Sequence, residues 1–290
     1  MSTDPTTSKA VGATGVNHQS GRPERSPMQL GWLLPAASSL IVLYLTLPVG
    51  VVLARTLPSG LVVDYLTRPI VTEALRLSFI SSSLAVGLIV LLGTPTAYLL
   101  ARREFRGRNI VETLIDLPIV LPPAVAGVAL LFTFGRRGLL GPWLSQLGIE
   151  IAFTLTAVVM AQLFVAAPFY IRTVRAGFAT VDREAEEAAR VFGAGPLTAF
   201  WRITVPLSLP SFIGGVVLAW AKAIGEFGAT ILFAGSFLGR TQTLPLAIYQ
   251  ALESDLNAAL VISAILIAVS FLVLLLFRLT TGVWVEPLRD

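Results

Sequence analysis

The chain has 290 residues, of which 55% are hydrophobic and only 13% are charged, and its mean hydropathy is +0.80. This composition excludes an ordinary soluble domain and indicates a protein that crosses a membrane several times. With no cysteine and a single histidine, His18 in a polar tail, the chain lacks the side chains for zinc sites and histidine-based catalysis. We therefore predict that the protein is not an enzyme and itself binds no cofactor and no metal.

The N-terminal segment, residues 1–29, is rich in Ser, Thr, Gly and Pro and predicts a disordered tail. The apolar run that follows, Gly31–Ala54, is too long for the core of a signal peptide, so we expect it to remain as the first membrane span. Residues 30–71 would then hold this span and the loop after it. Basic residues at the ends of spans explain the net charge of +4, so no nucleic-acid partner is expected.

Six apolar segments are long enough to cross a bilayer core of about 30 Å, which takes roughly 20 residues of helix. They are Gly31–Ala54, Leu77–Ala101, Leu114–Phe134, Phe153–Val174, Leu209–Ala234 and Ala258–Leu279. The predicted fold class is therefore an all-α polytopic membrane protein with six transmembrane helices. The third segment contains Pro118, Pro122 and Pro123, which favours a discontinuous helix lining a path over a simple packing kink.

Basic residues predict the orientation of the spans. With six spans, the tail, the second loop, the fourth loop and the C-terminus share one side, which carries most of the cationic residues. These are Lys9, Arg22, Arg25, Arg102, Arg103, Arg106, Arg108, Arg172, Arg175, Arg183, Arg190, Arg202, Arg278 and Arg289. By the positive-inside rule this side is cytoplasmic. We therefore expect a multi-pass inner-membrane protein with both termini, including a tail at residues 280–290, in the cytoplasm.

The most distinctive stretch is polar and lies between the fourth and fifth spans, at Asp182–Pro206. Alanine and glutamate favour a helix over 184–192, and Asp182 is expected to cap its N-terminus. The Gly193–Pro196 turn stops this helix, and a second short helix follows over Leu197–Val205, which the next proline ends. A helix–turn–helix on the cytoplasmic side, tethered to spans at both ends, is suited to contact another protein.

The spacing within this stretch resembles the EAA loop of ABC importer permeases, whose pattern is EAA, three residues, Gly, nine residues, Ile, one residue, Leu-Pro. The matching positions are Glu187, Ala188, Ala189, Gly193, Ile203, Val205 and Pro206, with Val205 in place of the usual leucine. The resemblance implies that the first four of these form a coupling surface that docks on an ATP-binding subunit. The alternative is an exposed helix without a partner.

ATP hydrolysis is expected on a partner chain. A P-loop needs the pattern G-x-x-x-x-G-K-[ST] to bind phosphates. The only lysines in the chain are Lys9 and Lys222, and neither lies in that pattern.

A second informative stretch is Trp220–Tyr249, at the end of the fifth span and beyond it. Lys222 and Glu226 are four residues apart, so on one helix they would share a face and could pair. Charges within a span are costly and usually face a bundle interior or a water-filled route. A structural ion pair, a gate or path role, and a Lys222 that reaches the membrane surface all remain open. Small residues that favour close packing, including across a dimer axis, are Gly225, Gly228, Ala229 and Thr230.

This stretch also indicates which group of importer permeases the chain resembles. GEFGAT at 225–230, RTQTLP at 240–245 and LPIVLPPAVAG at 117–127 resemble the permeases of the molybdate/sulfate group of importers, most of all the molybdate permease. The resemblance implies a type I ABC importer (MetI-like) permease fold over residues 72–279, with the EAA loop at 182–206.

The same resemblance implies the partners and the mechanism. We expect two ATP-binding subunits, a second permease subunit in a homodimer, and an extracytoplasmic oxyanion-binding protein that docks on Arg136–Ile151 and Ser236–Asn257. ATP-driven alternating access would move molybdate, with sulfate, thiosulfate or tungstate as alternative substrates and a heterodimer as the alternative assembly. A channel or an anchoring subunit without ATP coupling is the alternative from a different class.

We assign the translocation path or gate to Lys222, Glu226, Thr230 and Pro122. Further hydroxyl donors for an oxyanion would be Thr154, Thr156 and Ser236.

Overall fold

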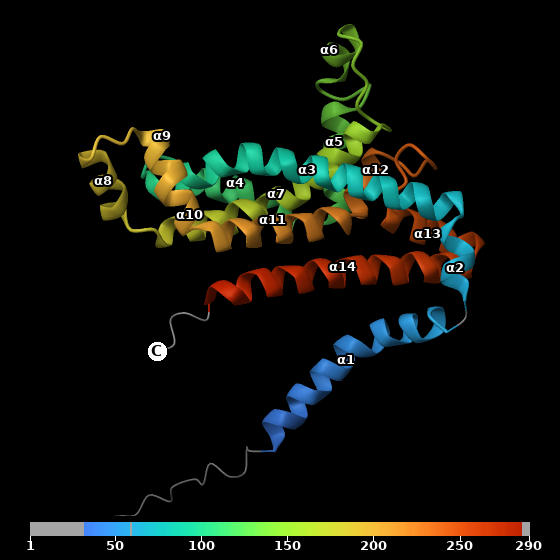
Figure 1. Ribbon diagram of the computed structural model, residues 1–290. Coiled ribbons are helices and arrows are strands. Elements are labelled where there is room, and N and C mark those ends of the chain that lie inside the picture. Colours follow the sequence, from blue (N-terminus) through green and yellow to red (C-terminus); the bar gives the residue numbers. More distant parts are fainter. Residues whose placement is uncertain (1–31, 59, 286–290) are drawn as a thin grey trace, which may run out of the picture. The chain divides into compact units, whose positions relative to one another are not determined.

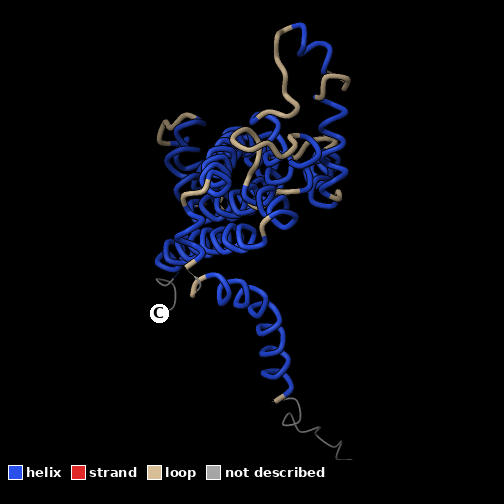
Figure 2. The backbone as a smooth tube through the Cα atoms, turned by 90° about the vertical axis from the view of Figure 1, so that its right-hand side faces the viewer, coloured by secondary structure: helices blue, strands red, loops and turns tan. Residues whose placement is uncertain are grey.

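A computed structural model describes residues 32–58 and 60–285 of the chain. The predicted disordered tail, residues 1–29, and the end of the predicted C-terminal tail, residues 286–290, lie outside the described residues. The chain divides into two compact units, Met1–Pro48 and Val49–Asp290. Every regular element in the described part is a helix, as the composition and the long apolar segments predicted (Figure 2).

The helices follow one another with short connections (Figure 1). In chain order they are α1 (Leu33–Thr56), α2 (Leu61–Leu66), α3 (Pro69–Arg102), α4 (Arg108–Val120), α5 (Pro123–Phe134), α6 (Gly141–Gln146), α7 (Leu155–Thr180), α8 (Arg183–Val191), α9 (Pro196–Ala199), the π-helical turn η2 (Phe200–Thr204), α10 (Val205–Leu207), α11 (Leu209–Ile224), α12 (Gly228–Phe233), α13 (Leu244–Ser254) and α14 (Leu256–Val285). The first unit contains only the start of α1, and all other elements belong to the second unit.

Four helices of the described part are long and apolar enough to cross a membrane, namely α1, α3, α7 and α14. Two further pairs could each form a bent span: α4 and α5 meet at 114°, and the run Pro196–Leu207 meets α11 at 75°. Four of the six predicted spans thus correspond to the long helices, the third corresponds to the α4–α5 pair, and the fifth contains α11 of the second pair. The predicted discontinuity of the third span is confirmed, because α4 ends at Val120 and the backbone is extended at Leu121 and Pro122.

The fifth predicted span, Leu209–Ala234, is not a single helix, and this prediction was wrong. α11 ends at Ile224, three residues follow outside any helix, and α12 begins at Gly228. At 1.5 Å per residue, the 16 residues of α11 cover about 24 Å, which is less than the ~30 Å of a bilayer core. The apolar run concealed the break, because hydropathy does not register the bond from Ala229 N to the Glu226 carboxylate or the close contact of Gly228 with Pro123.

The core of the second unit is the packing of α3, α7 and α11, which run side by side (Figure 1). Glycines let these helices approach closely. A Cβ added to Gly93 of α3 would lie 2.9 Å from the Tyr170 ring of α7, and one added to Gly215 of α11 would lie 2.9 Å from Val174. The three helices therefore form one closely packed layer that joins the two ends of the unit.

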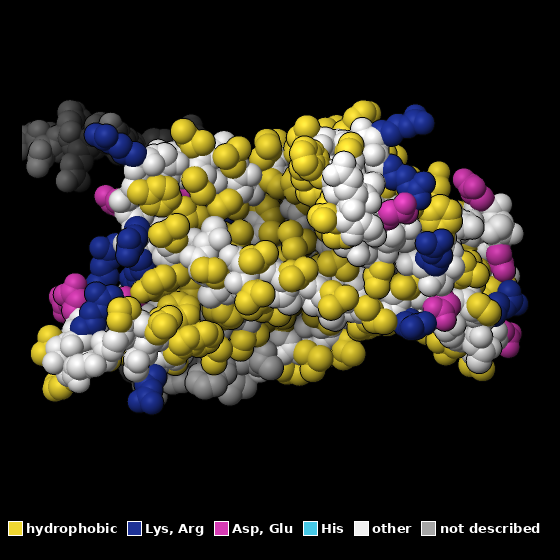
Figure 3. All heavy atoms as spheres, turned by 90° about the horizontal axis from the view of Figure 1, so that it is seen from above, with side chains coloured by type: hydrophobic (Ala, Val, Ile, Leu, Met, Phe, Trp, Pro, Cys, Tyr) yellow, Lys and Arg dark blue, Asp and Glu magenta, His cyan; other side chains and the backbone are white. Residues whose placement is uncertain are grey.

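Charged side chains gather at the two ends of the second unit, and hydrophobic side chains dominate the face between them (Figure 3). One end carries α8 and α9, and the opposite end carries α2, α12 and α13 (Figure 1). An apolar belt between charged ends is the surface expected of a protein surrounded by lipid chains.

α5 and α6 form an arm that projects from the bundle (Figures 1 and 2). Leu139 N donates to Phe132 O at 2.8 Å, and Arg136 and Glu150 form an ion pair at 2.7 Å across the arm. The hydrogen bond to Glu150 raises the pKa of Arg136. Leu139 and Trp143 are 78% and 70% exposed. The predicted docking segment Arg136–Ile151 is therefore a braced and exposed structure.

The other predicted docking segment, Ser236–Asn257, is buried at its centre and exposed on both sides of it. Thr241, Gln242 and Thr243 are at most 1% exposed, and the Gln242 amide nitrogen donates to Gln250 Oε1 at 2.6 Å. Thr241 accepts a hydrogen bond from Phe237 N at 3.1 Å. The polar run after α12 thus fixes the fold of its own loop, and the exposed parts of the segment are residues 237–240 and positions of and after α13 such as Tyr249, Leu252 and Leu256.

Candidate functional site

The polar segment after α7 folds as the helix and turn that its composition predicted. α8 spans Arg183–Val191, and the Asp182 carboxylate accepts a hydrogen bond from Glu184 N at 2.9 Å, as an N-cap does. After the helix, Gly193 has a φ of +87°, a left-handed conformation that favours glycine. These three predictions are confirmed.

The second helix of the segment differs from the prediction at both ends. Pro196 is its first residue, because the first turn of a helix tolerates a proline whose N–H would have no intrahelical partner. The helix continues through α9, η2 and α10 to Leu207, so Pro206 does not end it. The interruption comes at Ser208, directly before α11.

The outer surface of α8 is exposed. Glu187 and Ala188 are exposed, and Ala189 is half-buried. At the end of the helix, Val191 and Phe192 are 85% and 91% exposed, which marks an apolar tip on a charged surface. The sequence analysis missed this tip. The signal was present, because two large apolar residues follow directly after a polar helix.

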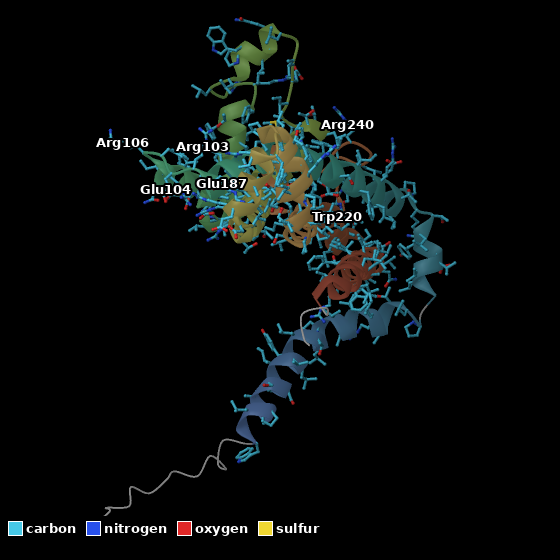
Figure 4. The ribbon with its side chains drawn as sticks, turned by 60° about the vertical axis from the view of Figure 1, so that its left-hand side comes forward. Arg103, Glu104, Arg106, Glu187, Trp220 and Arg240 are labelled. Atoms are coloured by element: carbon cyan, nitrogen blue, oxygen red, sulfur yellow. The ribbon has the colours of Figure 1, made fainter. Side chains whose placement is uncertain are left out.

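A groove of about 520 Å³ lies between α8 and the end of α3. Its charged lining residues are Arg102, Arg103, Arg183, Glu186, Glu187 and Arg190. Figure 4 shows Glu187 at the same end of the molecule as Arg103, with Arg240 lying away from them. Four arginines against two glutamates give the groove a positive excess.

One glutamate of this groove is buried, and the sequence analysis did not single it out. Glu186 is only 5% exposed, and its carboxylate lies 2.6 Å from Arg102 Nη2 at the end of α3. The Thr204 hydroxyl of η2 donates to the same carboxylate at 2.7 Å. Arg102 also donates to Val181 O at 3.0 Å. Helical spacing gave only a weak signal, because Glu184, Glu186 and Glu187 lie within one turn of the same polar helix.

The break between α4 and α5 forms a second candidate region. Pro122 supplies its extended backbone, and a cavity of about 100 Å³ lies beside it. The lining residues are Pro118, Ile119, Leu121, Pro123, Ala126, Val165, Phe169 and Lys222. The Lys222 Nζ lies 5.9 Å from the centroid of the Phe169 ring. Among the residues that the structure describes, no carboxylate forms an ion pair with this ammonium group.

The predicted pairing of Lys222 with Glu226 is not formed. The two residues do not share a helix face, because α11 ends at Ile224. Glu226 is 3% exposed, and its carboxylate accepts a hydrogen bond from Ala229 N at 2.9 Å. The carboxylate thus binds a free N–H group in the first turn of α12, where helix N–H groups have no intrahelical partner.

The predicted small-residue face is used for close packing inside the chain. α12 packs on α5, and a Cβ on Gly228 would lie 2.5 Å from Pro123 Cβ. A Cβ on Gly127 of α5 would lie 2.8 Å from Ala229 O. Thr230 is fully buried beside this contact, and its hydroxyl has no hydrogen-bond partner within the described residues.

A further buried polar side chain belongs to α7. Gln162 is fully buried, and neither end of its amide has a hydrogen-bond partner in the described part of the chain. It shares a helix face with Val165 and Phe169, three and seven residues on, which line the Lys222 cavity. The sequence analysis missed Gln162, although a lone amide in an apolar span was a visible signal.

The other predicted donors lie elsewhere. Thr154 donates to Ile151 O at 2.5 Å, Ser236 donates to Gln250 Oε1 at 3.1 Å, and Thr156 is exposed. None of them lines the Lys222 cavity. Within the described ranges, no cluster of three His, Cys, Asp or Glu side chains could hold a metal ion.

Comparison with protein families gives a match over residues 89–281 to the family described as "Binding-protein-dependent transport system inner membrane component". The molybdenum transport system permease protein ModB of Mycobacterium tuberculosis is 46% identical over 72% of this chain and 80% of its own. The probable sulfate transport system permease protein cysT of Zygnema circumcarinatum is 35% identical over 85% and 87%. The molybdate/tungstate permease protein WtpB of Pyrococcus abyssi is 34% identical over 87% and 95%.

The fold also has solved counterparts. A subunit of a bacterial alginate ABC transporter, crystallised with its alginate-bound periplasmic protein, superposes with a TM-score of 0.64. The match is 17% identical in sequence and covers 89% of this chain and 96% of that one.

Helical spans, a broken helix and an exposed helix–turn–helix at one end give the chain the fold of type I ABC importer (MetI-like) permeases. The chain belongs to the family of inner-membrane components of binding-protein-dependent transport systems, and within it to the molybdate/sulfate group. It is a multi-pass membrane transport subunit.

Proposed function

We propose that this chain is the permease subunit of a molybdate importer that works by ATP-driven alternating access. The observation that carries the choice of substrate is the 46% identity to a molybdenum permease, against 35% to a sulfate permease. ATP would be hydrolysed on separate ATP-binding subunits, two per transporter, and this chain would bind no cofactor itself.

The proposed coupling surface is the outer face of α8. Its residues are Glu187, Ala188, Ala189 and Gly193, and the exposed Val191 and Phe192 extend it. Small side chains allow a partner to approach closely, and a fully exposed apolar tip is stabilised when a partner covers it. The exposed glutamate offers a carboxylate to an arginine or a backbone N–H of the ATP-binding subunit.

The proposed translocation path passes the break between α4 and α5. Lys222 lines the cavity there without a carboxylate partner, and Pro122 keeps the backbone open. An ammonium group without a counter-charge is costly within a span, so we expect the Lys222 side chain to serve transport. Gln162 and Thr230 are candidates for additional donors, since both are buried and have hydrogen-bonding groups without a partner within the described residues. Glu226 would act at the gate by holding α12 in place.

The proposed assembly is a homodimer of this chain with an extracytoplasmic oxyanion-binding protein on the opposite side from the ATP-binding subunits. The exposed arm α5–α6 is the proposed docking surface for the binding protein. The arginine bias of the sequence supports a cytoplasmic location for both termini.

The test is uptake of radioactive molybdate in a strain that lacks this chain. We expect uptake and molybdoenzyme activity to be lost and to return with the wild-type chain, with excess sulfate competing weakly. Loss of growth on sulfate with normal molybdoenzyme activity would instead assign a sulfate permease, which the cysT relative favours as the second candidate. Strong competition by tungstate would indicate a shared molybdate/tungstate system, as WtpB is named.

A further inference from the structure

We propose that the buried cluster of Arg102, Glu186 and Thr204 is the joint that transmits movement of the ATP-binding subunits from α8 to the membrane helices. The proposal rests on the proposed function of α8 as the coupling helix. It assigns a task to the inner face of that helix, whereas docking uses the outer face.

The geometry of the cluster connects three elements through one carboxylate. Glu186 of α8 binds Arg102 of α3 at 2.6 Å and accepts from Thr204 of η2 at 2.7 Å. The Tyr98 hydroxyl of α3 lies 3.4 Å from the second carboxylate oxygen. Arg102 additionally binds Val181 O, just before α8, at 3.0 Å. The start and the middle of α8 are thereby both bonded to the last turn of α3.

This joint is the principal link between α8 and the bundle. α8 packs mainly on α9 and η2, which belong to the same segment. By contrast, η2 is fixed to the bundle by aromatic rings: Phe200 packs on Tyr98 of α3 at 4.9 Å and on Phe178 of α7 at 5.9 Å between ring centroids. A displacement of α8 therefore reaches α3 directly through Arg102 and reaches α11 through Thr204 and η2.

The chemistry suits a stiff connection. The side chains of Arg102 and Glu186 are only 9% and 7% exposed, so water screens their attraction little. Charge-assisted hydrogen bonds are shorter and stronger than neutral ones, and a bond of 2.6 Å is at the short end. α3 is 34 residues long and packs on α7, α11 and α13. A displacement of its last turn is therefore transmitted to these three helices.

The experiment compares the same substitution at two adjacent positions, Glu186→Gln and Glu187→Gln. Each variant is purified with its ATP-binding subunits and reconstituted in liposomes with the binding protein and radioactive molybdate. Three quantities are measured: the ATP-binding subunit that co-purifies, the rate of ATP hydrolysis, and the molybdate transported per ATP hydrolysed. Glutamine preserves shape and the acceptor for Thr204, but it removes the charge that faces Arg102.

We expect Glu186→Gln to keep normal association with the ATP-binding subunit and to lower the molybdate transported per ATP about tenfold, the effect of losing one bond between charged groups. Glu187→Gln should reduce association and leave the ratio unchanged in the complexes that remain. At the other side of the joint, Arg102→Lys should lower the ratio less than Arg102→Gln, because lysine keeps the charge.

A purely structural role of the cluster would reduce association and transport in parallel and leave the ratio unchanged, which would overturn the proposal. An unchanged ratio and normal association in Glu186→Gln would overturn it as well. If the wild-type chain itself binds no ATP-binding subunit, the proposed function is wrong. The wild-type measurement shows this before any variant is compared, so the two failures can be told apart.

Discussion

Two adjacent glutamates of α8 lie in different environments. Glu186 is 5% exposed and bonded to α3 and η2, whereas Glu187 is exposed on the outer face. The residue type is the same, so the difference comes from position on the helix. Only the place of α3 beside α8 decides which carboxylate is desolvated and which remains available to a partner.

Lys222 is the residue on which the proposed path can be tested most directly. An oxyanion that passes the cavity gains a charge-assisted interaction with the unpaired ammonium group, which contributes about 1.5–3 kcal/mol. We expect Lys222→Met to reduce molybdate uptake about tenfold or more, with normal amounts of chain in the membrane and normal association with the ATP-binding subunit.

The matched control for Lys222 is Lys222→Arg, which keeps the positive charge and should retain most of the uptake. Uptake by Lys222→Met at the wild-type rate would contradict a path role. In that case the contact with the Phe169 ring would be the only observed interaction left for this side chain.

At the scale of elements, α12 is held against α5 by close backbone approach. A methyl group at Gly228 has no room, since its Cβ would lie 2.5 Å from Pro123 Cβ. We expect Gly228→Ala to destabilise the protein by about 1–3 kcal/mol, the usual cost of overpacking. The measurement is the thermal unfolding midpoint of the purified chain in detergent.

Gly87 provides the control for this substitution. It lies within α3, is exposed, and has no atom within 4 Å of an added Cβ. Gly87→Ala should leave the midpoint unchanged or raise it, because alanine favours a helix over glycine. Equal midpoints for the two variants would argue against the close α5–α12 contact.

A second element-scale prediction concerns the start of α14. Asp255 accepts hydrogen bonds from Asn257 N and Ala258 N, and from the Tyr65 hydroxyl at 2.9 Å, and it pairs with Arg68 at 3.3 Å. The bond from Ala258 N is the largest cause of a lowered Asp255 pKa, followed by the bond from Tyr65. Asp255 thus caps α14 and ties it to α2.

Because the folded-state pKa of Asp255 is lowered, its contribution to stability is present above the ordinary value of 3.8 and is lost as the pH falls through the folded-state value. We expect Asp255→Asn to lower the unfolding midpoint at pH 7, and the difference from wild type to shrink below pH 3.8. Asp64→Asn, at an exposed position of α2, is the control and should have little effect. A difference that grows as the pH falls would contradict this assignment.

At the scale of the whole molecule, the orientation in the membrane can be tested with single cysteines, because the natural chain has none. We expect a cysteine at Ala188 of α8 to react with an impermeant maleimide only from the cytoplasmic side. A cysteine at Ser145 of the arm should react only from outside. Both positions are exposed in this chain alone. The labelling is therefore done on membranes without the ATP-binding subunits and the binding protein, which are proposed to cover these surfaces. Labelling of both positions from the same side would refute the predicted orientation.

Local patterns in the sequence were enough to predict the class of protein and its main segments. Long apolar runs must lie in lipid, and helix propensity, an N-cap and glycine at a left-handed position act within a few neighbouring residues. For this reason α8, its cap at Asp182 and its turn at Gly193 could be predicted, as could the break marked by the prolines around Pro122. The spacing that begins at Glu187 identified the family for the same reason.

Which side chains meet, by contrast, depends on the packing of helices that are distant in the sequence. Arg102 and Glu186 are 84 positions apart in the sequence and form an ion pair. Lys222 and Glu226 are four positions apart and do not pair, because α11 ends between them. The fifth span breaks because Glu226 binds the start of α12 and Gly228 fits against Pro123. Such contacts depend on how closely distant backbones approach. A sequence pattern does not show how closely two backbones approach. It also does not show which polar groups, such as the Gln162 amide, become buried between them.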